Sequence, residues 1–378
     1  MTTKLSRRGL LALPALLPLA AALPGRAQAA MPPITDALGR TVQLKAPAER
    51  IVIDFNYEEF TVVAGAAGWD RVYGFNRTQW AVNRSAIFRR YLVPIPRLAD
   101  LADIGSVEDN TFSLERVLSL RPDLVILGYW SFVGLPEQVK QMEALGIPVL
   151  VVDYNAEIPE RHVASTLAMG AATGNEERAR TLATLYTDKL ADIRRRVADV
   201  KTRPKAYVEL GQGGAGVVGN TYWKGMWGRL LEFAGADNIA AGHLAGSGAW
   251  GPLSPEYVLS ANPDAIFIAG SSWAGRPNAV LTGFDANIDT TRARLAPYAQ
   301  RQGWPELTAI KDNQLFAIEH GLCRALFDYT ATYYLAKQLY PDRFTDIDPV
   351  GELRTYHERF LPVKFEGTWM ARIVPAPA

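Results

Sequence analysis

Short apolar runs alternate with amphipathic segments along the first half of the chain. Four of the apolar runs indicate buried strands, at residues 50–54, 71–75, 123–127 and 148–152. Helical periodicity falls between them, at residues 57–67, 113–120 and 137–145. Pro122 ends the second of these helices and Gly146 caps the third. Because parallel strands need crossovers between them, the alternation predicts a parallel sheet with helices on both faces.

The pattern changes between residues 160 and 200, where the chain is polar and helical with one break at Gly174-Asn175. The piece after the break, residues 176–200, would be roughly 37 Å long at about 1.5 Å per residue. An apolar strand follows at residues 206–210 and the alternation restarts. We therefore predict an α/β fold of two Rossmann-like lobes with parallel sheets, joined by one long helix. The predicted divisions are residues 1–29, 30–159, 160–203, 204–341 and a C-terminal extension, 342–378.

One internal repeat supports this division. The segment SLERVLSLRPD at residues 113–123 recurs as SPEYVLSANPD at residues 254–264, and each copy runs into an apolar strand. The order of a serine cap, a helix, Pro-Asp and a strand is also common in α/β proteins, so convergence is the alternative explanation. The match falls at equivalent places in the two predicted lobes, which favours a duplicated unit.

The first 29 residues predict an export signal that is cleaved. Lys4, Arg7 and Arg8 precede an apolar run at residues 10–23, which is too short to span a membrane. A small-x-small cleavage site follows at residues 27–29. The segment SRRGLL at residues 6–11 resembles a twin-arginine export motif, and an ordinary Sec signal is the alternative. We expect a product in the periplasm that begins at Ala30.

Charge and cysteine content exclude several classes of function. The formal net charge is +1, and loss of four basic and no acidic residues with the signal changes it to −3. This balance argues against nucleic acid and against a polybasic membrane patch. The only cysteine, Cys323, rules out an intramolecular disulfide and a cysteine-cluster metal site.

Other chemical motifs are weak. Gly214, Gly216 and Gly219 fit G-x-G-x-x-G after a strand, but residues 220–225 (NTYWKG) do not open directly into a helix, as a dinucleotide site requires. The four histidines show no local metal-ligand spacing, and Glu58-Glu59 fits a charged helix start better than a catalytic dyad. No nucleophile–base pair is apparent, so the sequence predicts no enzyme, no cofactor and no resident metal.

A set of motifs in fixed order carries a family resemblance. They are RIVI at 50–53, SLERVL at 113–118, RPDLVI at 121–126, LGIPV at 145–149, LSPEYVL at 253–259, NPD at 262–264 and the segment 304–318. With this layout the chain resembles the iron-siderophore and vitamin B12 periplasmic-binding family, over residues 35–341. The resemblance implies a monomeric solute-binding protein that delivers a metal complex to an ABC permease dimer and its ATPase. A ferric siderophore is the expected ligand, and molybdate or tungstate, haem, cobalamin and a nickel complex are alternatives. Coupling to a membrane receptor as a ligand sensor also stays open.

Ligands of parallel α/β lobes meet the loops at the carboxyl ends of the strands. In the first lobe these loops offer Tyr57, Arg77, Trp80, Tyr129, Trp130 and Tyr154. In the second lobe they offer Trp223, Trp250, Trp273, His320 and Arg324. Aromatic rings pack well against a flat or apolar chelate, and arginines bind anionic oxygens. By resemblance, Trp250 matches a cleft tryptophan of the B12 binders.

Glu115 and Glu256 occupy the same position in the two copies of the repeat. Ser113 and Ser254 are the predicted N-caps, which puts each glutamate in a first helical turn. By resemblance, these two carboxylates dock the permease, one from each lobe. Compensation of the helix dipole is the competing explanation, and the two roles can coexist.

Overall fold

The structure of the chain is a computed structural model that describes residues 1–2, 31–245 and 249–373. The predicted export signal and its cleavage site therefore lie almost entirely outside the described residues. Within the described ranges, no helix is both long enough and apolar enough to cross a membrane. Residues from Met31 onward form one compact unit built around two five-stranded sheets.

The first sheet is parallel throughout, as predicted, with strand order β5-β4-β3-β6-β7. Its strands are β3 (Ile51–Ile53), β4 (Val72–Phe75), β5 (Ala102–Asp103), β6 (Leu124–Gly128) and β7 (Val149–Val152). The helices of this lobe are α1 (Tyr57–Ala64), α2 (Ser85–Leu92), α3 (Leu114–Ser119), α4 (Tyr129–Gly134) and α5 (Pro136–Ala144). Strands β3, β6 and β7 are buried at every position, as expected for a sheet covered on both faces. A short hairpin of β1 (Ile34–Thr35) and β2 (Thr41–Val42) precedes them.

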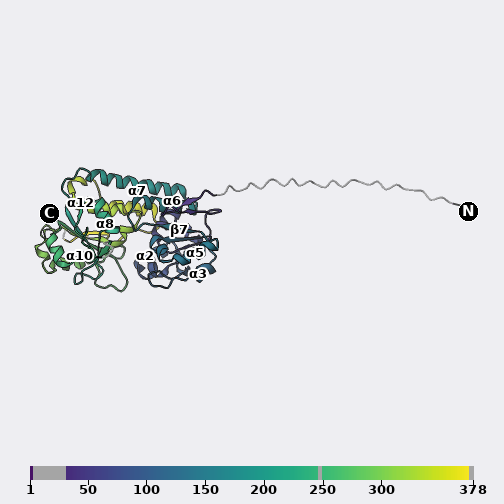
Figure 1. Cartoon of the computed structure of the whole chain (residues 1–378), viewed down its shortest axis with the longest axis horizontal. Helices are drawn as coiled ribbons and strands as arrows, with labels where there is room; N and C mark the ends of the chain where they lie inside the picture. The colour runs from purple at the N-terminus through teal and green to yellow at the C-terminus, as the bar shows by residue number, and fades with distance from the viewer. Residues whose placement is uncertain (3–30, 246–248, 374–378) are drawn as a thin grey trace. The chain divides into compact units, whose positions relative to one another are not determined.

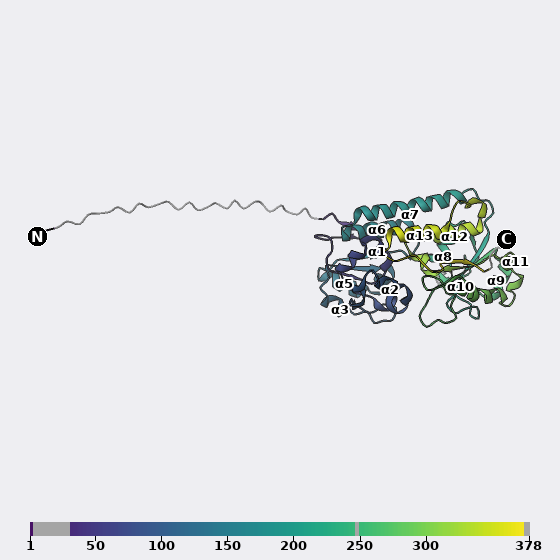
Figure 2. The ribbon, with the colours of Figure 1, turned by 180° about the vertical axis from the view of Figure 1, so that it is seen from behind.

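Two helices connect the lobes. Helix α6 (Pro159–Thr173) ends at Gly174, whose left-handed backbone (φ 70°) caps it, and α7 (Glu176–Val197) follows. At about 1.5 Å per residue, the 22 residues of α7 span about 33 Å. This helix packs against α1 of the first lobe and against α8 (Met226–Phe233) and α12 (Tyr329–Leu339) of the second. It runs across both lobes in the two opposite views, which confirms the predicted linking helix (Figures 1 and 2).

The second sheet repeats this plan but is not purely parallel. Its order is β10-β8-β12-β13-β14, with β8 (Lys205–Leu210), β10 (Asp237–Asn238), β12 (Ala265–Gly270), β13 (Leu315–Glu319) and β14 (Met370–Arg372). The last strand pairs antiparallel to β13. The remaining helices are α9 (Pro255–Ala261), α10 (Ile288–Leu295), α11 (Thr308–Lys311) and α13 (Pro349–Phe360). A two-stranded ribbon, β9 (Thr221–Tyr222) with β11 (Trp250–Gly251), lies outside this sheet.

The C-terminal extension that the sequence sets apart is built into the second lobe. Helix α13 packs against α12, and β14 completes the sheet beside β13. The amide of Glu319 also donates to the carbonyl of Trp369, 2.8 Å away. The described part of the extension therefore forms an edge strand and one layer of the lobe.

The two copies of the repeat have matching local geometry. The hydroxyl of Ser113 accepts from the amide of Arg116, and that of Ser254 accepts from Tyr257. Before each proline the chain passes through a left-handed residue, Arg121 at φ 49° and Asn262 at φ 48°. In each lobe the following aspartate then accepts backbone N–H groups at the start of the neighbouring strand. The shared left-handed position shows that the sequence repeat is also a structural repeat.

Candidate functional site

A pocket open to solvent lies between the two sheets, beyond the carboxyl ends of β3, β6 and β7. We call it the outer pocket, and its space is about 730 Å³, including solvent at the mouth. First-lobe residues form most of its wall: Phe55, Gln79, Glu108, Gly128, Tyr129, Trp130, Ser131, Asp153 and Asn155. The second lobe contributes Arg324. Its position agrees with the rule that α/β folds bind ligands at the carboxyl ends of parallel strands.

A second hollow, the inner pocket, adjoins the outer one because Phe55, Gln79 and Arg324 line both. Its wall includes charged residues of both lobes, among them Glu58, Glu59, Arg84 and Glu319. The C-terminal extension contributes His357, Leu361 and Trp369. The inner pocket is therefore an interior layer of ionic groups behind the outer pocket.

The charged groups of the inner pocket have partners within their own lobe. Arg84 of the first lobe forms an ion pair with Glu58 at 2.9 Å, and both side chains are largely buried. Glu319, at the end of β13, accepts a hydrogen bond from the Ser271 hydroxyl at 2.9 Å. Burial, and then the charge of Glu58, raise the pKa of Glu59 to about 8, so Glu59 is largely protonated at neutral pH. Protonation of Glu59 limits the negative charge buried there.

Arg324 has no such partner. Its Nε atom is buried without a hydrogen-bond acceptor, and no ion pair involves it among the described residues. Its guanidinium carbon lies 5.7 Å from the centre of the Phe55 ring. Burial, and then the positive charge of Arg84, lower the pKa of Arg324. A cation held beside a second cation is well placed to receive an anionic group from a ligand.

An acidic group lies behind the first-lobe wall of the outer pocket. Asp54 follows β3, is fully buried, and its Oδ2 atom has no partner among the described residues. Burial raises the pKa of Asp54 to about 6, although hydrogen bonds from Ser131 and Asn76 oppose the shift. The Tyr57 hydroxyl donates to the carbonyls of Asp54 and Asn76 and fixes this turn. Asp54 is therefore a buried acid whose pKa lies close to neutral pH.

Four of the residues predicted to bind the ligand line the two pockets. Tyr129 and Trp130 open α4 at the mouth of the outer pocket, and the Trp130 side chain is 66% exposed. Arg324 lines both pockets, and Tyr57 lines the inner one. Ligand contact by these side chains stays a prediction.

The other predicted first-lobe residues lie outside both pocket linings. Trp80 is fully buried and stacks on Tyr57 with ring centres 4.7 Å apart. Arg77 donates to the carbonyls of Ala99 and Leu101 at 3.1 and 2.8 Å, so its guanidinium ties a loop together. Tyr154 is buried, with its hydroxyl 2.9 Å from that of Thr166.

The predicted aromatic residues of the second lobe also lie outside both pocket linings. Trp273 is beside His320, whereas Trp223 and Trp250 belong to the ribbon or follow it. His320 accepts from the Trp227 indole N–H at 3.1 Å, and Trp273 lies 5.7 Å from its ring. Burial, followed by the charge of Arg324, holds the pKa of His320 well below its usual range, so the ring is neutral. Trp250, on β11, is 59% exposed, and Trp223 follows β9.

Sequence reasoning did not select the charged wall of the inner pocket. The sequence pattern predicts a charged helix start for Glu58 and Glu59, and it does not single out Arg84 or Glu319. The available signal was position, since Glu58 and Glu59 follow β3 closely and Glu319 ends β13. No such signal pointed to the part of the inner pocket that the C-terminal extension lines, because residues 357–369 lie far from the repeated motifs.

Comparison with known proteins establishes the family. A family model described as periplasmic binding protein matches residues 57–320, well over half of the chain. The chain belongs to this family of solute-binding proteins, and its fold is that of the TroA-like members. It is thus a periplasmic binding protein of the kind that serves ABC importers, which implies a permease partner.

Individual relatives differ in the ligand that their names give. The structure of a TroA-like periplasmic binding protein, FepB, from Veillonella parvula has a TM-score of 0.83 and 33% identity, over 90% of this chain and 99% of that one. The molybdate-binding protein MolA of Haemophilus influenzae is 24% identical, over 90% of this chain and 93% of its own length. A vitamin B12-binding protein of Salmonella typhimurium is 29% identical, but over only 42% of this chain and 56% of its own. These relatives agree on the class of protein and do not agree on a ligand.

Proposed function

We propose that the chain captures an anionic metal chelate, foremost a ferric siderophore, in the outer pocket and delivers it to an ABC importer. The observation that carries this proposal is Arg324, whose buried Nε lacks an acceptor at the junction of the two pockets. An anionic oxygen of a ligand would supply that acceptor. Tyr129 and Trp130 at the mouth offer ring faces to the organic part of a chelate.

The lining of the outer pocket favours a chelate over a small oxyanion. Two aromatic residues, Tyr129 and Trp130, line it, as is usual in sites for organic ligands. A small oxyanion is held instead by several converging N–H groups in a tight site. Molybdate is the second candidate, because a molybdate-binding relative aligns over 90% of this chain.

Native mass spectrometry of the protein purified from its own periplasm would identify the ligand directly. Titration of the stripped protein with ferric siderophores, haem, cobalamin, a nickel chelate and molybdate, followed by tryptophan fluorescence, would rank them. Arg324→Gln should weaken binding of an anionic iron chelate at least tenfold, since it removes the charged donor. Arg180→Gln, an exposed arginine of α7, is the matched control and should bind normally. Tight binding of molybdate alone would replace the siderophore with an oxyanion.

Docking to the permease is assigned to Glu115 and Glu256. Both carboxylates are exposed, in the first turns of α3 and α9, and neither has an ion-pair partner among the described residues. The repeat places them at equivalent points of two lobes, which suits a permease made of two like subunits. Exposed, unpaired carboxylates on each lobe are available to arginine or lysine residues of such a partner.

Export completes the proposed function. A cleaved signal would release a protein beginning at Ala30 or a neighbouring residue, which N-terminal sequencing of the periplasmic fraction would detect. Arg7→Lys with Arg8→Lys should block export through a twin-arginine route and leave a Sec route working. Recovery of an intact N-terminus from the cytoplasm would contradict the export assignment.

A further inference from the structure

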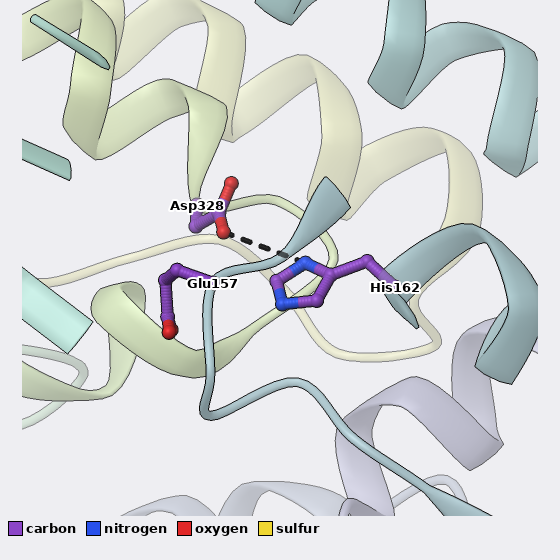
Figure 3. Close-up of side chains that lie close together, drawn as sticks. All are labelled: Glu157, His162 and Asp328. Carbon is purple, nitrogen blue, oxygen red and sulfur yellow. Dashed lines mark ion pairs between the residues drawn. The ribbon is translucent and has the colours of Figure 1, made fainter. Parts of the chain in front are cut away.

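Three ionisable side chains converge in the interior where the lobes meet the linking helices. Glu157 lies in the segment between β7 and α6, His162 is in the first turns of α6, and Asp328 is the residue before α12 of the second lobe. One ligand atom from each lies within 4.8 Å of the others. All three side chains are fully buried, and Figure 3 shows them close together, with the Asp328 carboxyl group directed toward the His162 ring.

The polar atoms of this cluster are mostly without partners. Glu157 Oε1, Asp328 Oδ1 and both ring nitrogens of His162 have no hydrogen bond among the described residues. His162 Nδ1 is 3.6 Å from Asp328 Oδ2, which is too long for a hydrogen bond. Fully buried polar atoms are nearly always paired in native proteins, so four orphans at one point indicate a missing partner.

The remaining oxygens are already held in place. Glu157 Oε2 accepts from the amide of Met226 at 3.0 Å, and the Tyr186 hydroxyl lies 3.4 Å from Asp328 Oδ2. Glu157 also has a left-handed backbone at φ 48°, a conformation that costs energy for a residue other than glycine. These contacts orient the two carboxyl groups from their outer sides and leave one free oxygen on each.

We propose that Glu157, His162 and Asp328 bind one divalent transition-metal ion, with Zn²⁺ the best match and Mn²⁺ or Fe²⁺ next. An imidazole nitrogen and two carboxylate oxygens are ligands that these ions share. In tetrahedral coordination, metal–ligand bonds of about 2.0–2.2 Å require neighbouring donors roughly 3.3–3.6 Å apart. Side chains within 4.8 Å reach this spacing by small rotations. A carboxylate oxygen that already accepts one hydrogen bond keeps a second lone pair, which would provide the fourth donor.

The charge balance favours a divalent ion. Two carboxylates give the cluster a charge of −2 when ionised, and no lysine or arginine forms an ion pair with either among the described residues. A divalent cation neutralises the cluster and pairs the free oxygen of each carboxyl group and one nitrogen of His162. A monovalent ion would leave one negative charge unbalanced, and Mg²⁺ or Ca²⁺ would make poor use of an imidazole.

This ion is distinct from the transported ligand. None of the three residues lines the outer or the inner pocket. The ion would instead join the end of the first lobe, the linking helix and the start of α12 in the second lobe. Its role is therefore structural, since it would fix the two lobes at the base of the cleft. The proposal does not depend on which chelate the cleft binds.

Refolding offers a direct test, because a fully buried ion exchanges only when the site opens. The ligand-free mature protein would be unfolded in denaturant that contains EDTA. It would then be refolded either without metal or with one of Zn²⁺, Mn²⁺, Fe²⁺ and Co²⁺. We expect one ion per chain by native mass spectrometry, a higher melting temperature than the metal-free protein, and visible Co²⁺ absorption typical of nitrogen and oxygen ligands. Absence of both a bound ion and a melting shift would overturn the proposal and leave a cluster held by shared protons.

Variants locate the ion. Asp328→Asn, Glu157→Gln and His162→Gln keep side-chain volume, and each should weaken metal binding at least tenfold. His357→Gln is the matched control, because His357 is also buried with both nitrogens unpaired but has aromatic neighbours instead of carboxylates. That variant should keep one ion per chain. Metal retained in all three cluster variants would place the ion elsewhere and contradict the assignment. The Co²⁺ spectrum of the wild-type chain decides the matter even if a variant fails to fold.

Discussion

The two lobes share one scaffold and differ in what their loops carry. Each begins its repeated unit with a serine cap, passes a left-handed residue before proline, and anchors the next strand with an aspartate. The outer pocket, in contrast, is lined almost entirely by the first lobe, with Arg324 as the contribution of the second. The second lobe instead incorporates the C-terminal extension as an antiparallel edge strand. The two lobes thus share the frame and the position of an exposed glutamate, and they differ in the loops that line the outer pocket.

The largest expected effect tests whether the lobes dock equivalently. Glu115→Gln with Glu256→Gln should reduce ligand uptake and stimulated ATPase activity at least 100-fold, since both charged contacts with the permease would be lost. If the two lobes contribute equally to docking, the two single variants should lower uptake by the same factor as each other. Transport by reconstituted vesicles measures this, with ligand affinity expected to stay unchanged.

A matched pair guards this interpretation against a simple loss of helix-dipole compensation. Glu176 and Glu177 are exposed acids in the first turn of α7, outside the repeat. Their replacement by Gln removes the same kind of charge and should leave uptake normal. Normal uptake by the Glu115 and Glu256 double variant would restrict those residues to helix stabilisation, worth about 0.3–1 kcal/mol each.

The next effect tests whether the repeated aspartates contribute equally to stability. Asp123 accepts the amides of both Glu49 and Arg50 at 2.9 Å, whereas Asp264 accepts the amide of Lys205 at 2.7 Å. Asp123→Ala should therefore cost about 2–3 kcal/mol in free energy of unfolding, and Asp264→Ala about 1–2 kcal/mol. Urea denaturation of both variants measures the difference. Equal losses would mean that the second hydrogen bond of Asp123 contributes nothing.

A smaller effect concerns the pH dependence of stability, and it compares Glu59 of the first lobe with Glu319 of the second, both of which line the inner pocket. The pKa of Glu59 is raised by burial, and next by the charge of Glu58, to about 8. A carboxyl with a raised folded pKa stabilises the fold most below its unfolded value, near pH 4.5, and this contribution is lost as pH rises through about 8. Glu59→Gln should consequently gain about 1–3 kcal/mol relative to wild type at pH 9 and little at pH 5. Thermal unfolding from pH 5 to 9 shows the slope.

Glu319→Gln provides the comparison. Burial raises the pKa of Glu319, but the charge of Arg84 and the Ser271 hydroxyl oppose the shift. Its substitution should remove a paired carboxylate and give a loss of stability with a weaker dependence on pH. Parallel pH profiles for the two variants would contradict the different roles assigned to Glu59 and Glu319.

Much of the fold followed from periodicity. The predicted strands at residues 50–54, 123–127 and 148–152 match β3, β6 and β7 to within one or two residues, because each is an apolar run bounded by Pro, Asp or Gly. The break at Gly174 followed from the left-handed cap that glycine favours. The sequence does not predict the antiparallel strand β14. A strand of only three residues carries no pattern that distinguishes an edge strand from a loop.

The site was harder to predict than the fold. Position at the carboxyl ends of strands pointed to Tyr129, Trp130 and Arg324, and these residues line the outer pocket, although their contact with a ligand stays a prediction. Position after a strand does not decide whether a side chain turns outward or into the lobe, and Trp80 turns into the core beside Tyr57. The Glu157, His162 and Asp328 cluster joins two positions five residues apart to one in the other lobe. Only tertiary packing brings such residues together.

The smallest expected effect concerns how far the lobes move relative to each other. Helix α7 spans both lobes, and Asp285 of the second lobe pairs with Arg89 and Arg90 of α2 at 2.6 and 3.3 Å. Arg90 also pairs with Glu366 of the C-terminal extension at 2.5 Å. Because the lobes are tied by a continuous helix and by these ion pairs, we expect hinge closure to be resisted. The radius of gyration from X-ray scattering should change by less than about 1 Å when a ligand binds. Ala183→Pro, which breaks α7 in its interior, should permit a larger change, and a contraction of several ångströms in the wild-type chain would mean that these ties do not hold the lobes.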